Sequence, residues 1–339
     1  MTTVLLWASV AVAILAIVVV AVRWHRKKLN LTGGGVFKML EQTIIEAIKP
    51  QMIQALNDHL AAQGVALRTV QVVVNKKVVR ETSGLFHKDF EKVLKLVNSD
   101  IPTMLVGPAG SGKNVCIKQV ADALGLEMYY TNNVSNEFKV TGFVDAGGVY
   151  HETEFYKAFR NGGVFFLDEI DSSDPSALII LNSAISNGYV TFPHEKVERH
   201  PDFRCIAAAN TWGNGRDFQY VGRNALDAAS LDRFVSFRFD YDESLEKALF
   251  PNDRILRFVW EARKTAFENQ IRHIFSTRTI KYAYEMEEAG FDLDTIIRSV
   301  VIKGMNADDI NTVIRNMDLD RYDNAYLDKM YDLLNDYED

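Results

Sequence analysis

Cysteine is scarce in this chain, which has only Cys116 and Cys205 among 339 residues. Two cysteines cannot form a disulfide framework, and no CxxC pair or Cys/His cluster indicates a zinc site. We therefore expect the body of the chain in a reducing compartment. Hydrophobic residues make up 47% and charged residues 24% of the chain, which excludes a disordered or collagen-like protein. A chain of this length is expected to form about two folded domains.

The chain also lacks an excess of positive charge. Its formal net charge is -7, which argues against a protein that coats nucleic acid through its overall field, although a local basic groove stays open. The last segment, 318–339, has eight carboxylates against Arg321 and Lys329. A solvated acidic tail is the default interpretation of such a segment.

One long hydrophobic run stands at the start of the chain. Val4–Val22 has 19 residues with Ser9 the only polar one, and such a helix nearly spans a hydrocarbon core of about 30 Å. A cleaved signal peptide is the alternative, but no Lys or Arg precedes the run, which is also long for that role. The basic flank 23–28 would hold the following residues in the cytoplasm. The sequence predicts a single-pass membrane protein anchored by residues 1–28, with its body in the cytoplasm.

The segment 29–82 would connect this anchor to the body. NLTGGG at 30–35 is typical of a hinge. Apolar residues then recur every three or four positions over 37–60, which predicts an amphipathic helix interrupted at Pro50. That helix would pack on its own domain or form a self-association stalk, although its heptad pattern is not sustained. The segment 70–79 predicts a strand or a hairpin.

Short apolar runs alternate with helical patterns over 83–242. The runs predict five strands, at 103–106, 128–130, 164–167, 204–208 and 235–239. Such alternation predicts an α/β fold with a doubly wound parallel sheet. Further along, helical patterns at 254–267, 278–289, 293–302 and 308–317 predict an all-helical second domain over 243–317.

A glycine-rich loop follows the first predicted strand and precedes a helical pattern. It consists of Gly107, Pro108, Ala109, Gly110, Ser111, Gly112, Lys113 and Asn114, followed by Val115. In this context glycines let backbone N–H groups surround phosphates, and the lysine reaches the β- and γ-phosphates. Asn114 departs from the pattern, because a Ser or Thr hydroxyl usually holds magnesium there. Its amide oxygen is an alternative ligand, so nucleotide binding should survive and the hydrolysis rate is the property affected.

Two carboxylates end the third predicted strand. In a phosphate-loop protein such a pair supplies a magnesium ligand, here Asp168, and a general base for the attacking water, here Glu169. Alternatively the adjacent acids only begin a helix near Asp171. The fourth strand delivers Asn210 to the same sheet edge, where its amide would bond the γ-phosphate or the water, although an asparagine after a strand is also a common turn residue.

The order of these motifs, with LDRF at 231–234 and STR at 276–278, resembles AAA+ ATPases. It is most similar to the dynein-related MoxR group, which includes the small ATPase subunit of cobalt chelatase, the CbbQ proteins and ATPases of phages and Gram-positive bacteria. The stretch 141–159 is similar to that group's insert in the second helix, and 188–201 to its hairpin before sensor 1. The resemblance covers 83–317 and implies a P-loop AAA+ sheet with a helical lid.

The resemblance also assigns roles. It implies that Asn210 is sensor 1, that Arg278 is sensor 2 and that Arg233 is an arginine finger acting on a neighbouring subunit, with Arg223 as the second candidate. Each arginine could instead form a surface ion pair. A finger acting in trans implies a homo-oligomeric ring, expected to be a hexamer, that uses ATP and Mg²⁺.

Three functions stay open from the sequence. The leading one is an ATPase that remodels a partner protein, with a von Willebrand factor A-like protein as one candidate, and with Phe143 and Tyr150 as candidate partner contacts or hairpin packing residues. A nucleic-acid motor is the second, although the hairpin region offers only Lys139, Lys196 and Arg199. A nucleotide-gated scaffold with little turnover is the third.

Overall fold

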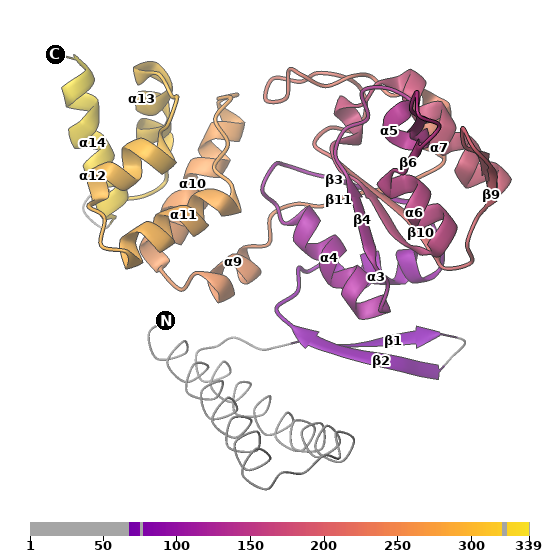
Figure 1. Ribbon diagram of the computed structural model, residues 1–339. Coiled ribbons are helices and arrows are strands. Elements are labelled where there is room, and N and C mark those ends of the chain that lie inside the picture. Colours follow the sequence, from indigo (N-terminus) through magenta and orange to yellow (C-terminus); the bar gives the residue numbers. More distant parts are fainter. Residues whose placement is uncertain (1–67, 75–76, 321–323, 339) are drawn as a thin grey trace, which may run out of the picture. The chain divides into compact units, whose positions relative to one another are not determined.

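The computed structural model describes residues 68–74, 77–320 and 324–338. The chain divides into two compact units, Met1–Arg68 and Thr69–Asp339, and the second contains the elements labelled in Figure 1. The predicted hinge at 30–35 and the predicted amphipathic helix at 37–60 lie outside the described residues.

The predicted single-pass membrane location is not supported and is corrected. Across the described ranges, no helix is both long enough and apolar enough to cross a bilayer. The run Val4–Val22, on which the prediction depended, lies outside those ranges.

Five parallel strands form the central sheet, in the order β11-β3-β10-β7-β4 (Figure 1). They are β3 (Thr103–Val106), β4 (Met128–Thr131), β7 (Gly163–Leu167), β10 (Phe203–Ala209) and β11 (Val235–Arg238). Each agrees with a predicted strand to within one residue at either end. Because β3, β10 and β7 are neighbours, the segments that follow these three strands emerge side by side at one edge of the sheet.

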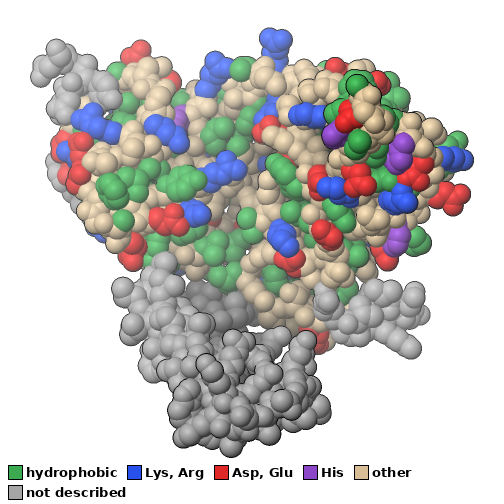
Figure 2. Space-filling model, in the orientation of Figure 1, with side chains coloured by type: hydrophobic (Ala, Val, Ile, Leu, Met, Phe, Trp, Pro, Cys, Tyr) green, Lys and Arg blue, Asp and Glu red, His purple; other side chains and the backbone are tan. Residues whose placement is uncertain are grey.

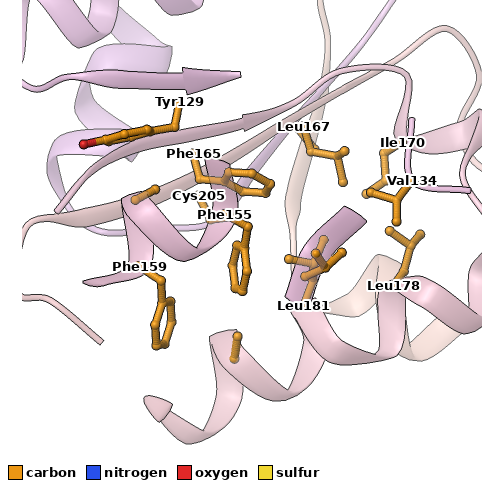
Figure 3. Close-up of a cluster of buried hydrophobic side chains, with 14 of the residues drawn as sticks. Tyr129, Val134, Phe155, Phe159, Phe165, Leu167, Ile170, Leu178, Leu181 and Cys205 are labelled. Carbon is orange, nitrogen blue, oxygen red and sulfur yellow. The ribbon is translucent and has the colours of Figure 1, made fainter. Parts of the chain in front are cut away.

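Helices cover both faces of this sheet. They are α3 (Phe90–Asn98) and α4 (Lys113–Leu124) on one face, and α6 (Glu154–Asn161) and α7 (Pro175–Asn187) on the other. Successive strand residues point to opposite faces, so Phe165 joins one hydrophobic cluster and Phe166 the other. In Figure 3 the ring of Phe155 on α6 lies beside Phe165, and the two meet edge to face with centroids 5.1 Å apart. The sheet is thus held rigidly under the loops at its edge.

Two short hairpins and an N-terminal pair of strands extend from this layer. The hairpins are β5 (Phe143–Val144) with β6 (Tyr150–His151), preceded by α5 (Phe138–Thr141), and β8 (Tyr189–Thr191) with β9 (Lys196–Glu198). They lie in the two stretches predicted as inserts. β1 (Arg68–Val74) and β2 (Lys77–Gly84) form a separate two-stranded sheet, in agreement with the predicted hairpin.

The chain after β11 is helical, as predicted. Its helices are α9 (Glu243–Leu249), α10 (Asp253–Glu268), α11 (Thr277–Glu288), α12 (Leu293–Ile296), α13 (Ala307–Asn316) and α14 (Ala325–Glu338), with a π-helical turn at Ile297–Val301. Helices α10 to α14 and the π-helical turn share one hydrophobic cluster of their own. The helix predicted over 293–302 is therefore α12 followed by the π-helical turn.

The acidic segment at the end of the chain differs from the prediction of a solvated tail. It forms α14, and its apolar side chains Tyr326, Leu327, Met330 and Leu333 are buried in the hydrophobic cluster of the C-terminal helices. These positions lie on one helical face, since they are one, three or four residues apart. The carboxylates occupy other positions, so the high charge concealed an amphipathic helix.

Candidate nucleotide-binding site

The glycine-rich loop joins β3 to α4 and leaves room for a ligand at its tip. A Cβ on Gly107 would lie 1.9 Å from the carbonyl oxygen of Phe239, so only glycine fits beside the neighbouring strand. Gly112 has φ of +93°, and a Cβ there would meet nothing within 4 Å. α4 begins at Lys113, and the preceding Gly112 has no side chain that could cap the helix. Its first N–H groups are therefore suited to an anion.

Lys113 is buried at the centre of the site. Its Nζ donates to the carbonyl oxygens of Gly107 and Pro108, at 2.7 and 3.0 Å, and to Oδ1 of Asn210 at 3.1 Å. Burial lowers the pKa of Lys113 to about 8, although nearby Asp168 acts to raise it. A desolvated ammonium of this kind gains strongly from a bound phosphate.

The two residues predicted to hold magnesium meet in the structure. Asn114 Nδ2 donates to Asp168 Oδ2 at 2.8 Å, and the Tyr130 hydroxyl donates to the same oxygen at 3.3 Å. A carboxylate and a neutral amide oxygen, completed by substrate phosphates, are a donor set that suits magnesium. Ser111 Oγ is buried nearby with no hydrogen-bond partner among the described residues. These observations fit a magnesium nucleotide.

Glu169 follows Asp168 in a left-handed backbone conformation, with φ of +51°. Although it precedes the 3₁₀ turn Ile170–Ser172, its side chain makes no capping bond. Instead Glu169 Oε1 lies 3.3 Å from Arg223 Nη2. Arg223, the second candidate for a finger, is thus paired with Glu169 of its own chain.

Asp171 fixes the backbone directly after β10, where Asn210 lies, and was not predicted as a site residue. It is fully buried, and its Oδ2 accepts hydrogen bonds from the backbone N–H groups of Asn210 and Thr211, at 3.1 and 2.9 Å. Arg223 Nε lies 3.5 Å from the same oxygen. The signal in the sequence was a third acidic residue within 167–171 (LDEID). A carboxylate buried at that position needs hydrogen-bond partners of this kind.

Two tyrosines hold the loop from either side and were also missed. The N–H of Ala109 donates to the hydroxyl of Tyr220 at 2.8 Å, and the hydroxyl of Tyr241 donates to the carbonyl of Ala109 at 2.8 Å. Tyr220 lies between β10 and the short helix α8 (Ala228–Asp232), and Tyr241 lies between β11 and α9.

A cavity of about 470 Å³ brings most of the predicted residues together. Its lining includes the loop from Ala109 to Val115, together with Asp168, Glu169, Asn210 and Arg278. Apolar side chains of α9 and α11, among them Leu245, Leu249 and Tyr282, line it as well. Arg233 is not part of this lining; it ends α8 and donates to Ser186 Oγ and to the carbonyl of Ala229.

The two hairpin aromatics have different surroundings. The ring of Tyr150 stacks on His194 with centroids 3.8 Å apart, and its hydroxyl donates to the carbonyl of Thr141 at 2.7 Å. Tyr150 therefore packs the first hairpin against the loop of the second. Phe143 stacks on His151 within its own hairpin but stays 47% exposed.

The part of the chain that holds the sheet and the loop is similar to known proteins. Residues 102–234 match the family model described as AAA domain (dynein-related subfamily). Protein NorQ of Paracoccus denitrificans is 24% identical over 227 residues, which are 62% of this chain and 82% of NorQ. An uncharacterized protein of Staphylococcus epidermidis is 28% identical over 196 residues, or 54% of this chain and 68% of that protein.

Two solved structures show weaker likenesses. NtrX from Brucella abortus has a TM-score of 0.40 and 13% identity, over 90% of this chain and 56% of that chain. A mutant of RuvB from Thermotoga maritima has a TM-score of 0.43 and 14% identity, over 70% of this chain and 79% of that chain. Because both scores are low, the assignment depends on the family model and the site. Residues 102–234 of this chain are therefore similar to AAA domains of the dynein-related subfamily.

Proposed function

We propose that the protein is a MoxR-like AAA+ ring ATPase that hydrolyses ATP with magnesium and uses the cycle to remodel or activate a partner protein. The observation that carries this proposal is the cavity shared by the phosphate loop, Asp168, Glu169, Asn210 and Arg278. A phosphate-binding loop, a magnesium carboxylate and a base are the parts that ATP hydrolysis needs.

The chemistry follows from where these residues lie. The triphosphate would bind the N–H groups at the start of α4 and the ammonium of Lys113. Asn114 and Asp168 would hold magnesium, which neutralises charge on the β- and γ-phosphate oxygens. Glu169 would take a proton from water as the water oxygen bonds to the γ-phosphorus and the bond to the ADP oxygen breaks. Asn210 and Arg278 would orient the water and the γ-phosphate.

The ion pair with Arg223 engages Oε1 of Glu169 and would orient its carboxylate toward the attacking water. Asn210 is poised for its role because its side-chain oxygen accepts from Lys113 and its backbone is fixed by buried Asp171. Arg233 would complete the site of a neighbouring copy, in a ring that we expect to be a hexamer.

The client contact is proposed at the β5-β6 hairpin. Phe143, Val144 and Val149 are exposed there by 47, 41 and 58% of their surface, and a cluster of exposed apolar side chains commonly marks a protein-binding site. Figure 2 shows apolar and histidine side chains together on the right of this view, the region where Figure 1 labels β6 and β9. A partner protein similar to von Willebrand factor A domains would be a separate chain.

The nucleic-acid motor has less support from the same region. Two of the basic residues considered for it are engaged within the chain, since Arg199 pairs with Asp100 and Lys196 lies over the ring of Tyr189. Such pairing leaves less free positive charge for a phosphate backbone. The hairpins therefore favour a protein client.

ATP turnover by the purified full chain, measured against protein concentration with Mg²⁺, tests the proposal. Turnover per chain should rise with concentration as rings form. Glu169→Gln should bind ATP normally and lose about 10² to 10⁴ in turnover, as expected for a general base. Glu268→Gln, at an exposed position near the end of α10, is the matched control and should behave as wild type.

Two results would contradict the enzyme. One is equal turnover for wild type and Glu169→Gln at ring-forming concentrations. The other is tight ATP binding without turnover at any concentration, which would favour the nucleotide-gated scaffold and make Asn114 the decisive residue.

A further inference from the structure

A buried carboxylate in the lid collects hydrogen bonds from two helices. Glu246 of α9 is only 1% exposed. Its oxygens accept from Trp260 Nε1 at 2.7 Å, from Arg263 Nη2 at 2.8 Å and Nη1 at 3.3 Å, and from Thr277 Oγ1 at 2.5 Å. A buried charge is tolerated only when paired and hydrogen-bonded in this way. Glu246 therefore fixes the start of α11, where Thr277 lies, against α10.

Arg263 extends the same network toward the sheet domain. Its guanidinium carbon lies 3.7 Å from the centroid of the Tyr241 ring, and its Nε donates to the carbonyl of Phe275 at 2.8 Å. A guanidinium stacked on an aromatic face and paired with a carboxylate is held in one orientation. Tyr241 in turn donates its hydroxyl to the carbonyl of Ala109 in the phosphate loop.

The phosphate loop also touches the start of α11 directly. Gly110 has φ of +76°, and a Cβ on it would lie 2.7 Å from the Cβ of Ser276. Ser276 caps α11, with its Oγ accepting from the N–H of Arg278 at 3.1 Å and its own N–H bonded to Thr279 Oγ1. The first turn of α11, which carries Arg278, is thus fixed both by Glu246 and by the loop.

From these contacts we infer that Glu246 and Arg263 are positioning residues for ATP hydrolysis. They hold the first turn of α11 so that Arg278 faces the nucleotide cavity, and Tyr241 links that position to the phosphate loop. This inference rests on the proposed function, because it concerns how Arg278 is presented to the γ-phosphate. Neither Glu246 nor Arg263 touches the phosphates in this role; both act through Arg278.

A double-mutant cycle in ATP turnover tests the inference. Glu246→Gln and Arg263→Gln should each lower kcat by about 10²-fold, the cost of a misplacement near 1 Å, with little change in ATP affinity. In an Arg278→Ala background, neither substitution should lower kcat further, because the residue through which they act is gone. Arg257→Gln, at an exposed position on α10, is the matched control and should leave turnover unchanged.

The variant Tyr241→Phe keeps the inference testable if the Glu246 or Arg263 variants fail to fold. The variant keeps the ring beneath Arg263 and removes only the hydroxyl that bonds Ala109. It should fold normally by thermal unfolding, lower kcat by about tenfold, and lose that effect in the Arg278→Ala background. Additive losses in the double mutants, or wild-type turnover in Tyr241→Phe, would overturn the inference.

Hydrogen exchange separates this inference from the proposed function. ATP should slow the exchange of amides over 276–281 in Glu169→Gln, which binds without turning over, and the protection should disappear when Glu246→Gln is added. Equal protection with and without Glu246→Gln would overturn the positioning role. If the wild type does not hydrolyse ATP at all, the proposed function fails, while this measurement still decides whether Glu246 positions the first turn of α11.

Discussion

The two arginines predicted to act on the γ-phosphate lie in different surroundings. Arg278 lines the cavity beside the phosphate loop, and its helix is fixed there by Ser276 and Glu246. Arg233 lies at the end of α8, where it bonds Ser186 and Ala229 instead. One chain therefore assembles the loop, the carboxylates and the lid arginine, and leaves the second arginine outside the cavity. The proposed function accordingly assigns Arg278 to the site of its own chain and Arg233 to the site of a neighbour.

The largest expected effect on turnover is that of replacing Arg233. Arg233→Ala should lower kcat by about 10³-fold at ring-forming concentrations, because a finger supplied in trans stabilises the charge of the transition state. The affinity for ATP should not change, since Arg233 is not in the cavity of its own chain. Arg238→Ala, an exposed arginine on β11 paired with Asp240, serves as the control. Turnover by Arg233→Ala equal to this control would remove the trans role.

Mixing variants turns the comparison into a direct test. Equal amounts of Arg233→Ala and Glu169→Gln should regain about a quarter of the wild-type rate, since some interfaces then combine an intact finger with an intact base. Mixing Arg278→Ala with Glu169→Gln should regain nothing, because Arg278 and Glu169 would have to be intact in the same chain. Recovery in both mixtures, or in neither, would contradict the assignment.

The strands and the phosphate loop could be predicted because their signals are local. Buried parallel strands are continuous apolar runs, as in β7, and the loop is specified by eight adjacent residues. The contacts that hold the loop are not local. Tyr220 and Tyr241 reach Ala109 from 111 and 132 residues away, and nothing in their own neighbourhood marks them. The burial of α14 was missed for a different reason, because a count of charges ignores the face on which they lie.

Arg223 sharpens the comparison further, because it was predicted as an alternative finger and lies within reach of its own Glu169. Arg223→Ala should lower kcat by about 10- to 100-fold through misplacement of Glu169 and of the buried Asp171. Unlike Arg233→Ala, it should not recover when mixed with Glu169→Gln. Arg223→Lys should restore part of the rate if charge beside Glu169 is what matters. Recovery of Arg223→Ala by mixing would instead make it a finger in trans.

The affinity for ATP should depend on pH through Lys113. With its pKa lowered to about 8, the free protein loses this proton above that pH, whereas the phosphates retain it in the complex. The Kd should therefore be flat below about pH 8 and rise by about tenfold per pH unit above it. Lys113→Arg, which stays charged, should show no such rise in calorimetric titrations, and an equal rise in both proteins would exclude Lys113 as its source.

The same pKa shift has an opposite consequence for the stability of the free protein. Between about pH 8 and the ordinary lysine value of 10.5, the unfolded chain binds more protons at this position than the folded chain. The contribution of Lys113 to the free energy of unfolding should thus increase with pH across that window. Deprotonation of Lys113 above pH 8 would therefore weaken ATP binding without lowering the free energy of unfolding.

The smallest expected effect is at Asn114. Its amide nitrogen occupies one oxygen of Asp168, so a magnesium ion must compete with that hydrogen bond. Asn114→Thr places a hydroxyl there, and kcat should rise by about fivefold with an unchanged Kd for ATP. Asn114→Ala, which removes the oxygen ligand without replacing it, is the contrasting variant and should raise the Mg²⁺ concentration needed for half-maximal turnover. If the Thr variant is as impaired as the Ala variant, the amide oxygen of Asn114 is the ligand that this site requires. Asparagine would then be the functional residue at this position, in place of the usual hydroxyl residue.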